Sequence, residues 1–207
     1  ARQPDYAVGQ LIRTRIALAL GDAKEAEESA LRATRLAPQD QLGWTLLSTA
    51  WRLRDDPREH WLCRYDELVM PIDLDLPAGL EAALNARHRA AASPAEQSLR
   101  HGTQTPGNLF HRADPQVQRL AQDLLVAIEA RLVALPMEPD HPFLARNTGR
   151  IGFSASWSVR LTDQGHHASH MHPAGWLSSA CYIAVPPEVG QGAEQGALTF
   201  GAPDQAL

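Results

Sequence analysis

The hydrophobic pattern of this chain changes its period near residue 150, and this change constrains the fold more than any other feature of the sequence. Residues 8–70 carry apolar side chains three or four positions apart, which is typical of amphipathic helices. Residues 153–161 instead alternate apolar and polar side chains, as half-buried strands do. Residues 177–185 and 196–200 are predicted to form two further strands, separated by turn residues. Helices followed by closely spaced strands predict an α+β chain with separate helical and β domains.

The helical region has clear boundaries in its first part. Gly21 follows an apolar segment at an expected C-cap position, and Asp22 is placed to open the next helix. That helix is expected to end before Pro38 and to carry small side chains on one face. These are Ala26, Ala30 and Ala33. A third helix is predicted after Asp40, with Trp44, Leu47 and Trp51 at helical spacing.

This pattern resembles a tetratricopeptide repeat, in which small residues allow paired helices to pack closely. Ala26 and Ala33 stand where such a repeat has small residues, and Pro38 closes its second helix. The next helix begins where a following repeat would start, at a period of about 34 residues. A second repeat has no clear alanine at the matching site near His60. The resemblance implies a tetratricopeptide-like segment over residues 1–92, and an unrelated helical hairpin is the alternative.

The middle of the chain leads from the helical region to the predicted strands. An alanine-rich helix is expected to end at about Ala92, and residues 97–110 are polar and irregular, which indicates an ordered loop or a short strand. Asp114 as N-cap and Pro115 at the first helical position predict a helix that stops near Pro136. Its apolar stripe comprises Val117, Leu120, Leu124, Leu125, Ile128 and Leu132. We expect this stripe to pack on a sheet or another helix.

Histidines gather in one short segment, residues 166–172, which holds four of the nine in the chain. In an extended segment, side chains two positions apart point to the same side. His170 and His172 would therefore present both imidazoles to one point. Imidazole is neutral near pH 7 and binds iron, zinc, copper or nickel. Taken alone, such a pair is more often two solvated loop histidines than a metal site.

The sequence around the histidine pair adds further information. The segments that matter are residues 98–100, 102–105, 157–161, 170–173, 179–186 and 198–201. No single segment is specific, but together they resemble a bacterial family of 2-oxoglutarate- and Fe(II)-dependent oxygenases that is often found behind tetratricopeptide repeats. The resemblance covers roughly residues 97–204. It implies that residues 93–207 form the N-terminal part of a double-stranded β-helix, or jelly-roll, domain with a supporting helix.

The resemblance also implies the chemistry of the site. Most such oxygenases hold Fe(II) with a His-x-Asp or His-x-Glu element and a later His, and His170 matches the first ligand. His172 stands where the carboxylate is usual, so the site is less anionic and zinc, nickel or copper are also plausible occupants. The third His and the Arg or Lys that binds 2-oxoglutarate are expected beyond Leu207. Tyr182 is the candidate for cofactor binding, with core packing as its alternative role.

The predicted function is that of an Fe(II)- and 2-oxoglutarate-dependent dioxygenase. Helical repeats beside an oxygenase domain suggest a protein or peptide substrate, by analogy. The chain as given is expected to be inactive, because part of the site would lie outside it. The alternative is a tetratricopeptide protein-binding module with an inactive cupin-like β domain. A continuation of the gene that carries a His and then an Arg would discriminate between the two.

Composition bears on partners and location. The net charge is -5 and the arginines form no run, so we expect no binding to nucleic acid or anionic membranes. No apolar stretch approaches the roughly 20 residues of a membrane span. Cys63 and Cys181 are predicted to be free thiols in a reducing compartment, which favours a cytoplasmic protein. Cys181 is expected to be a buried small apolar side chain.

Overall fold

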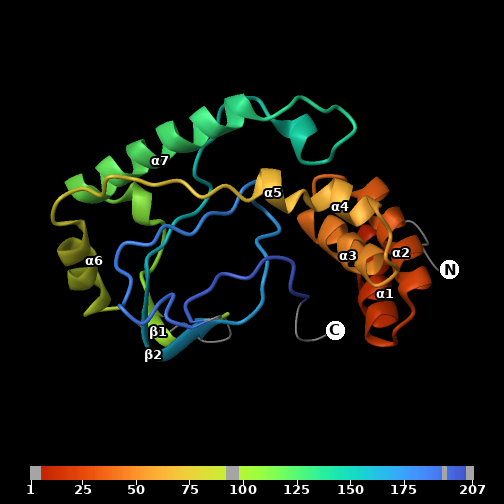
Figure 1. The fold of residues 1–207 in the computed structure, drawn as a ribbon, viewed down its shortest axis with the longest axis horizontal. Helices are drawn as coiled ribbons and strands as arrows, with labels where there is room; N and C mark the ends of the chain where they lie inside the picture. The colour runs from red at the N-terminus through yellow and green to blue at the C-terminus, as the bar shows by residue number, and fades with distance from the viewer. Residues whose placement is uncertain (1–5, 92–97, 193–194, 204–207) are drawn as a thin grey trace.

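The computed structural model describes residues 6–91, 98–192 and 195–203. Short helices gather at one end of the molecule, a long helix runs along one side, and a two-stranded sheet lies below it (Figure 1). Helices together with a small antiparallel sheet are compatible with the expected α+β class. The expected domain boundary between residues 92 and 93 lies outside the described residues.

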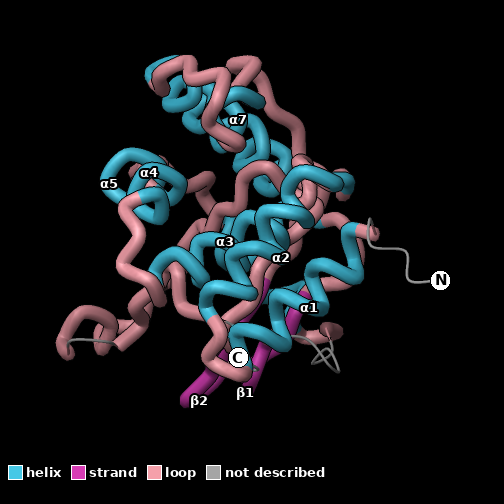
Figure 2. Tube along the Cα trace, turned by 90° about the vertical axis from the view of Figure 1, so that its right-hand side faces the viewer, coloured by secondary structure: helices cyan, strands magenta, loops and turns pink. Residues whose placement is uncertain are grey.

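The helical end is built from five consecutive helices. Their bounds are Ala7–Ala19 (α1), Ala23–Leu36 (α2), Gln41–Arg52 (α3), Arg58–Cys63 (α4) and Tyr65–Leu68 (α5). The first three lie side by side and are joined by short turns (Figure 2). The helical character predicted for residues 8–70 is therefore confirmed.

The predicted helix boundaries are formed by local hydrogen bonds. Gly21 has a φ of 75°, the left-handed conformation that glycine adopts without steric cost at a helix end. The carboxylate of Asp22 accepts a hydrogen bond from Glu25 N at 3.0 Å. The carboxylate of Asp40 likewise accepts from Leu42 N at 2.9 Å. Each cap satisfies a backbone donor that the helix itself leaves unpaired.

The small face of α2 forms the centre of the helical core. Ala26 and Ala33 pack in one buried cluster with Leu11, Ala17, Leu18, Leu46 and Ala50. Ala30 packs in a second cluster with Leu47 and Trp51. Alanines at these positions let α1 and α3 approach α2 from two sides, because they add little bulk between the helix axes.

A second core lies under the long helix α7 (Pro115–Ala134), which contacts α6 (Leu80–His88) and the short 3-10 helix η1 (Leu109–His111). As predicted, the carboxylate of Asp114 caps α7 by accepting from Gln116 N and Val117 N at 3.2 and 3.3 Å. The buried members of this core are Leu80, Leu84, Leu109, Val117, Leu120 and Leu124. Leu132 is buried as well, whereas Leu125 and Ile128 of the predicted stripe are only partly buried.

The sheet differs from the prediction. It pairs β1 (Leu99–Gln104) with β2 (Val159–His167), so β2 begins and ends later than the strand expected over residues 153–161. Residues 177–185 and the described part around residues 196–200 are irregular, and the two strands predicted there are wrong. A strand needs a neighbour for its backbone hydrogen bonds, and among the described residues these segments pair with none. Cys181 lies on this irregular chain and is exposed rather than buried.

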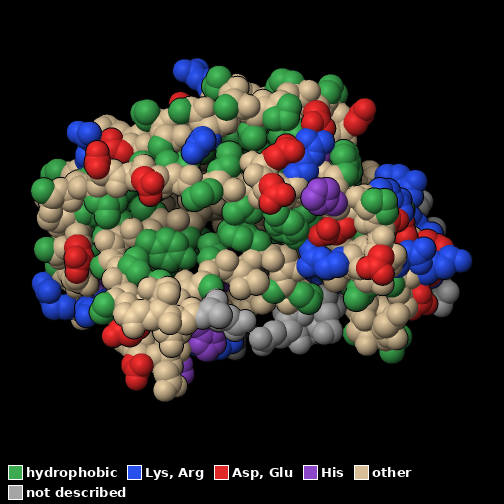
Figure 3. Space-filling model, viewed as in Figure 1, with side chains coloured by type: hydrophobic (Ala, Val, Ile, Leu, Met, Phe, Trp, Pro, Cys, Tyr) green, Lys and Arg blue, Asp and Glu red, His purple; other side chains and the backbone are tan. Residues whose placement is uncertain are grey.

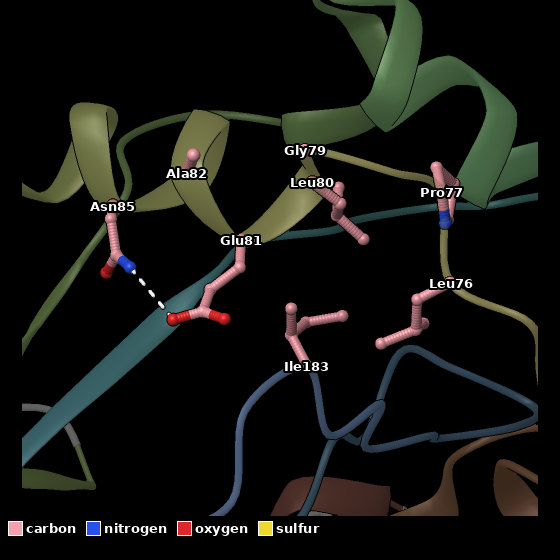
Figure 4. A pocket seen from close by; sticks show the side chains of 8 residues that line it. All are labelled: Leu76, Pro77, Gly79, Leu80, Glu81, Ala82, Asn85 and Ile183. Atoms are coloured by element: carbon pink, nitrogen blue, oxygen red, sulfur yellow. Dashed lines mark hydrogen bonds between the residues drawn. The ribbon is translucent and has the colours of Figure 1, made fainter.

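Segment 177–185 contacts the core under α7 through Ile183. Ile183 packs against the core that contains Leu80. Figure 4 shows Ile183 facing Leu76 and Leu80 across an open pocket of about 540 Å³. Glu81 on the rim of this pocket accepts a hydrogen bond from Asn85 Nδ2 at 3.4 Å. Ile183 thus contacts a helix layer, whereas Cys181 and Val185 of the same segment are exposed.

The helical end is joined to the rest of the molecule by polar contacts. Arg64 donates two hydrogen bonds to the carboxylate of Glu138, at 2.6 and 2.5 Å. His141 is fully buried, and its Nδ1 accepts from Phe143 N and Leu144 N at 3.1 and 3.2 Å. Its Nε2 then carries the proton and donates to Trp61 O at 3.2 Å. Neutral His141 therefore holds the turn before the 3-10 helix η2 (Leu144–Arg146) against α4.

Charged side chains of both signs cover the helical end (Figure 3). Several are paired, including Arg13 with Glu25, Arg52 with Glu59, and Arg58 with Glu27, each at 2.5 Å. Exposed pairs of this kind contribute little to stability individually. None of the helices in the described part of the chain combines the length and hydrophobicity of a membrane span.

The free energy of unfolding should decrease in mild acid because of His141. Burial, and next the charge of Arg64, lower the pKa of its imidazole in the folded protein. In the unfolded chain a histidine has a pKa of about 6.5, so the unfolded state binds the proton more readily than the folded state does. The stability that neutral His141 contributes is therefore complete above about pH 6.5. It is lost as the pH falls from there toward the pKa of the folded state. Urea denaturation from about pH 7.5 to about pH 5.5 measures this loss.

The His141→Gln variant isolates the contribution of this residue, because other histidines also titrate. We expect it to be less stable than the parent at neutral pH and to lose less stability on acidification. An unchanged difference between parent and variant across the whole pH range would contradict this account of His141.

Candidate metal site

The histidine segment is positioned by the pairing of β2 with β1. At the end of the ladder Leu99 lies opposite His167, and Arg100 lies opposite His166. One further backbone hydrogen bond, from Ala168 N to Ser98 O at 2.9 Å, continues the pairing beyond the last strand residue. The chain then leaves the sheet, so His170 and His172 lie just past a fixed strand end.

An irregularity in the ladder sets the direction of that strand end. Between Arg100 and Gly102 the register shifts, and His101 and Gln164 both adopt positive φ, at 51° and 59°. The hydroxyl of Thr162 donates to His101 O at 2.9 Å across the bulge. A Cβ atom at Gly165 would lie only 2.5 Å from His101 O. Bulges of this kind bend a strand and reorient the side chains that follow.

Three imidazoles lie beside one another after the bulge. The rings of His170 and His172 have centroids 5.0 Å apart and are perpendicular, at 89°. The ring of His167 lies 5.5 Å from that of His170. Two imidazoles that share one ion at about 2.0–2.1 Å per metal–nitrogen bond have ring centres roughly 4.5–5.5 Å apart. The spacing of His170 and His172 thus suits a shared divalent ion.

Hydrogen bonding leaves Nε2 of His170 available to bind a metal ion. Its Nδ1 lies 2.8 Å from Ala168 O, a carbonyl that only accepts, so Nδ1 carries the proton. The neutral ring then has its lone pair on Nε2, the form in which histidine binds metals. A backbone carbonyl on the other ring nitrogen is the usual way in which a metal-binding imidazole is oriented. Trp157 flanks the second imidazole, with its ring 5.4 Å from that of His172.

The surroundings lower the pKa of two of these rings and so favour their neutral form. Partial burial lowers the pKa of His172, and the charge of His170 adds to the effect. Partial burial also lowers the pKa of His167, followed by the charges of the neighbouring histidines. A lowered pKa retains the lone pair that a metal ion needs near neutral pH.

The predicted pair is brought together, but not in the predicted way. His170 and His172 lie on irregular chain after β2, whereas the sequence predicted an extended segment. Within the described residues, no group of three or more His, Cys, Asp or Glu side chains could hold an ion. The donor atoms therefore fit two positions of a metal site, and a complete site needs further ligands. Metal binding by His170 and His172 stays a prediction.

The remaining candidate from the sequence, Tyr182, lies at an exposed position, as does Arg160 on the nearby strand. Tyr182 sits on the irregular segment 177–185 with 56% of its surface exposed, and its role in cofactor binding stays a prediction. Arg160 lies on β2 opposite Thr103 and is exposed as well.

One histidine near the sheet was missed by the sequence analysis. His88, at the end of α6, is 7% exposed, with Nδ1 2.9 Å from Thr103 Oγ1 and Nε2 2.9 Å from Ser158 Oγ. It ties α6 to β1 and to the residue before β2. Burial, and then the charge of Arg160, lower its pKa. A lone histidine in an alanine-rich helix gives no signal of these distant partners.

Comparison with known proteins bears on the same part of the chain. Residues 155–206, about a quarter of the sequence, match the model of a family described as "Putative 2OG-Fe(II) oxygenase". The match supports an oxygenase-type enzyme at the level of the family. The matched residues include β2 and both His170 and His172. No curated protein and no solved structure matches the chain.

Replacing Gly165 should disturb the strand end that precedes the histidine pair. In Gly165→Ala the new methyl group would lie 2.5 Å from His101 O and 2.8 Å from Thr162 O, and both are backbone atoms. We expect a loss of about 1–3 kcal/mol in the free energy of unfolding. The matched control is Gly152→Ala, where an added Cβ meets nothing within 4 Å. Equal stability of the two variants in urea would show that the close approach at Gly165 is unimportant.

The histidine pair should dominate metal binding near the sheet. His170→Ala and His172→Ala should each weaken Co(II) binding, followed by isothermal titration calorimetry, by about tenfold or more, since each removes a ligand. His166→Ala is the control, because its exposed ring turns back toward Gln164 O at 3.1 Å. If the control weakened binding as much as the other two, the site would be assigned to the wrong histidines.

Proposed function

We propose that the protein to which this chain belongs is an Fe(II)- and 2-oxoglutarate-dependent oxygenase that hydroxylates its substrate. The observation that carries this proposal is the coincidence of two findings on one segment. The residues that match the oxygenase family contain the two histidines whose rings lie at a spacing suited to one ion. In this proposal residues 93–207 belong to a double-stranded β-helix domain, and residues 1–92 form a tetratricopeptide-like segment.

His170 and His172 would hold the iron, through Nε2 in the case of His170. When bound, Fe(II) and 2-oxoglutarate would supply the oxidising chemistry that converts a substrate C–H bond to a hydroxyl with one atom of O₂, while 2-oxoglutarate takes the other atom and is converted to succinate and CO₂. The carbonyl of Ala168 keeps the proton on Nδ1 of His170 and so fixes which nitrogen faces the ion. The ring of Trp157 covers one side of His172 and reduces the access of water there.

The use of His172 in place of a carboxylate has an electrostatic consequence. A neutral imidazole leaves the bound divalent ion with more net positive charge than a carboxylate would. Anionic ligands such as the carboxylates of 2-oxoglutarate are then attracted more strongly. The same change weakens the preference for iron over zinc, nickel or copper, because imidazole suits them all.

We further propose that the helical end binds a protein or peptide and presents it to the oxygenase domain in the cytoplasm. Its support is the close-packed arrangement of α1, α2 and α3, which is the kind of array that repeat proteins use for binding. The rival function is peptide binding alone, with an inactive β domain. A full-length sequence without a later His and Arg would favour that rival.

The proposal predicts 2-oxoglutarate turnover that depends on two residues. Full-length protein supplied with Fe(II), ascorbate, O₂ and 2-oxoglutarate should form succinate, because such enzymes also turn over slowly without substrate. The double variant His170→Ala with His172→Ala should reduce succinate formation by about 100-fold or more, as expected when two metal ligands are lost. His111→Ala, an exposed histidine bonded to Asn108, serves as the control. Turnover at the parent rate in the double variant would rule out this site.

A further inference from the structure

Helix α1 carries a stripe of exposed aliphatic side chains. Val8, Ile12 and Ile16 lie four residues apart and are 46%, 55% and 55% exposed. Residues with this spacing share one face of a helix. Leu11 and Leu18, on another face of α1, are buried in the helical core. One face of α1 therefore packs inside the molecule, whereas a second apolar face is about half exposed to solvent.

A shift of thirty-four residues places α1 on α3, because the first residue of α1, Ala7, falls on the first residue of α3, Gln41. Gly9 corresponds to Gly43, and the exposed stripe corresponds to Leu42, Leu46 and Ala50. The correspondence extends upstream, where Pro4 stands at the position of Pro38, the proline that follows α2. The two helices thus share a register in which each position of α1 has a counterpart in α3.

In α3 the corresponding positions are covered. Leu46 is 3% exposed, Ala50 is completely buried, and Leu42 packs against the same cluster. The surface that covers them includes Ala26 and Ala33 of α2. In α3, therefore, side chains of the preceding helix α2 cover the positions that correspond to the exposed stripe of α1.

The two glycines show the same contrast. A Cβ at Gly43 would lie 3.2 Å from Thr34 Cγ2 and 3.8 Å from Ala33 Cβ, because the end of α2 passes close to α3 there. A Cβ at Gly9 would meet only Tyr6 Cδ1, at 3.7 Å. Glycine within a helix is unfavourable relative to alanine. Close approach of α2 accounts for Gly43, whereas nothing that lies against α1 in the described structure accounts for Gly9.

We propose that a helix of the α2 type, encoded directly before Ala1 on the same polypeptide, packs on Val8, Gly9, Ile12 and Ile16. In the shared register Pro4 follows this helix as Pro38 follows α2. The counterparts of Ala26, Ala30 and Ala33 fall nine, five and two residues before Ala1, and they should be small residues. This inference is independent of the proposed oxygenase activity, since it concerns only the helical end.

The size of the stripe favours a helix of the same chain over a second copy. Three half-exposed aliphatic side chains bury far less than the roughly 1,200 Å² of a stable interface between separate chains. Association would also cost translational and rotational entropy that so small an area does not offset. A helix connected by a short turn avoids most of this cost, because its effective concentration is high.

The test compares the present chain with a longer protein that includes the natural upstream sequence. The double variant Ile12→Glu with Ile16→Glu should lower the melting temperature of the longer protein by about 5 °C or more. It should leave that of the present chain nearly unchanged, since both side chains are exposed in it. Leu46→Glu, the control on α3, should destabilise both proteins.

Gly9→Ala provides a second comparison of opposite sign. It should raise the melting temperature of the present chain slightly, through helix propensity, and lower that of the longer protein, where the methyl group meets the covering helix. Similar effects in both proteins would overturn the proposal. An upstream sequence without small residues at the three stated positions would also overturn it, as would a dimer of the longer protein that Ile12→Glu separates into monomers.

Discussion

The antiparallel pairing of β1 with β2 is the contact on which the rest of the site depends. It joins residues that are about sixty positions apart and is the only sheet among the described residues. Its bulge, with Gly165 packed against His101 O, sets the direction in which the chain leaves the ladder. His170 and His172 follow within a few residues, so this strand end determines where they lie. Without the pairing, the two imidazoles would be ordinary loop side chains.

Two buried histidines connect the elements around the sheet, and burial favours the neutral form of their imidazoles. His88 links α6 to β1 and to the residue before β2, and His141 links the helical end to the turn before η2. Burial lowers the pKa of each, as partial burial does for His172. Protonation in acid therefore removes the neutral form of the structural histidines, and also that of His172. We expect acid to weaken the fold and any metal binding together.

The sequence predicted those parts of the structure that depend on nearby residues. Asp22, Asp40 and Asp114 cap helices through bonds to backbone groups two or three positions away, and such signals are readable without knowledge of the fold. The strands expected over residues 177–185 and 196–200 failed because a strand also requires a distant partner. The contacts of His88 with Thr103 and Ser158 were unpredictable for the same reason. The proximity of His170 and His172 was anticipated from their two-residue spacing, although they lie on irregular chain and not on a strand.

The central claim is that His170 and His172 are two ligands of one iron ion. X-ray absorption at the iron edge tests it most directly, because outer-shell scattering from imidazole rings reports how many histidines bind the metal. Full-length protein loaded with Fe(II) should show at least two imidazole ligands at about 2.0–2.2 Å. The His170→Ala and His172→Ala double variant, if it retains iron, should show two fewer. The same number of imidazole ligands in parent and double variant would contradict the claim.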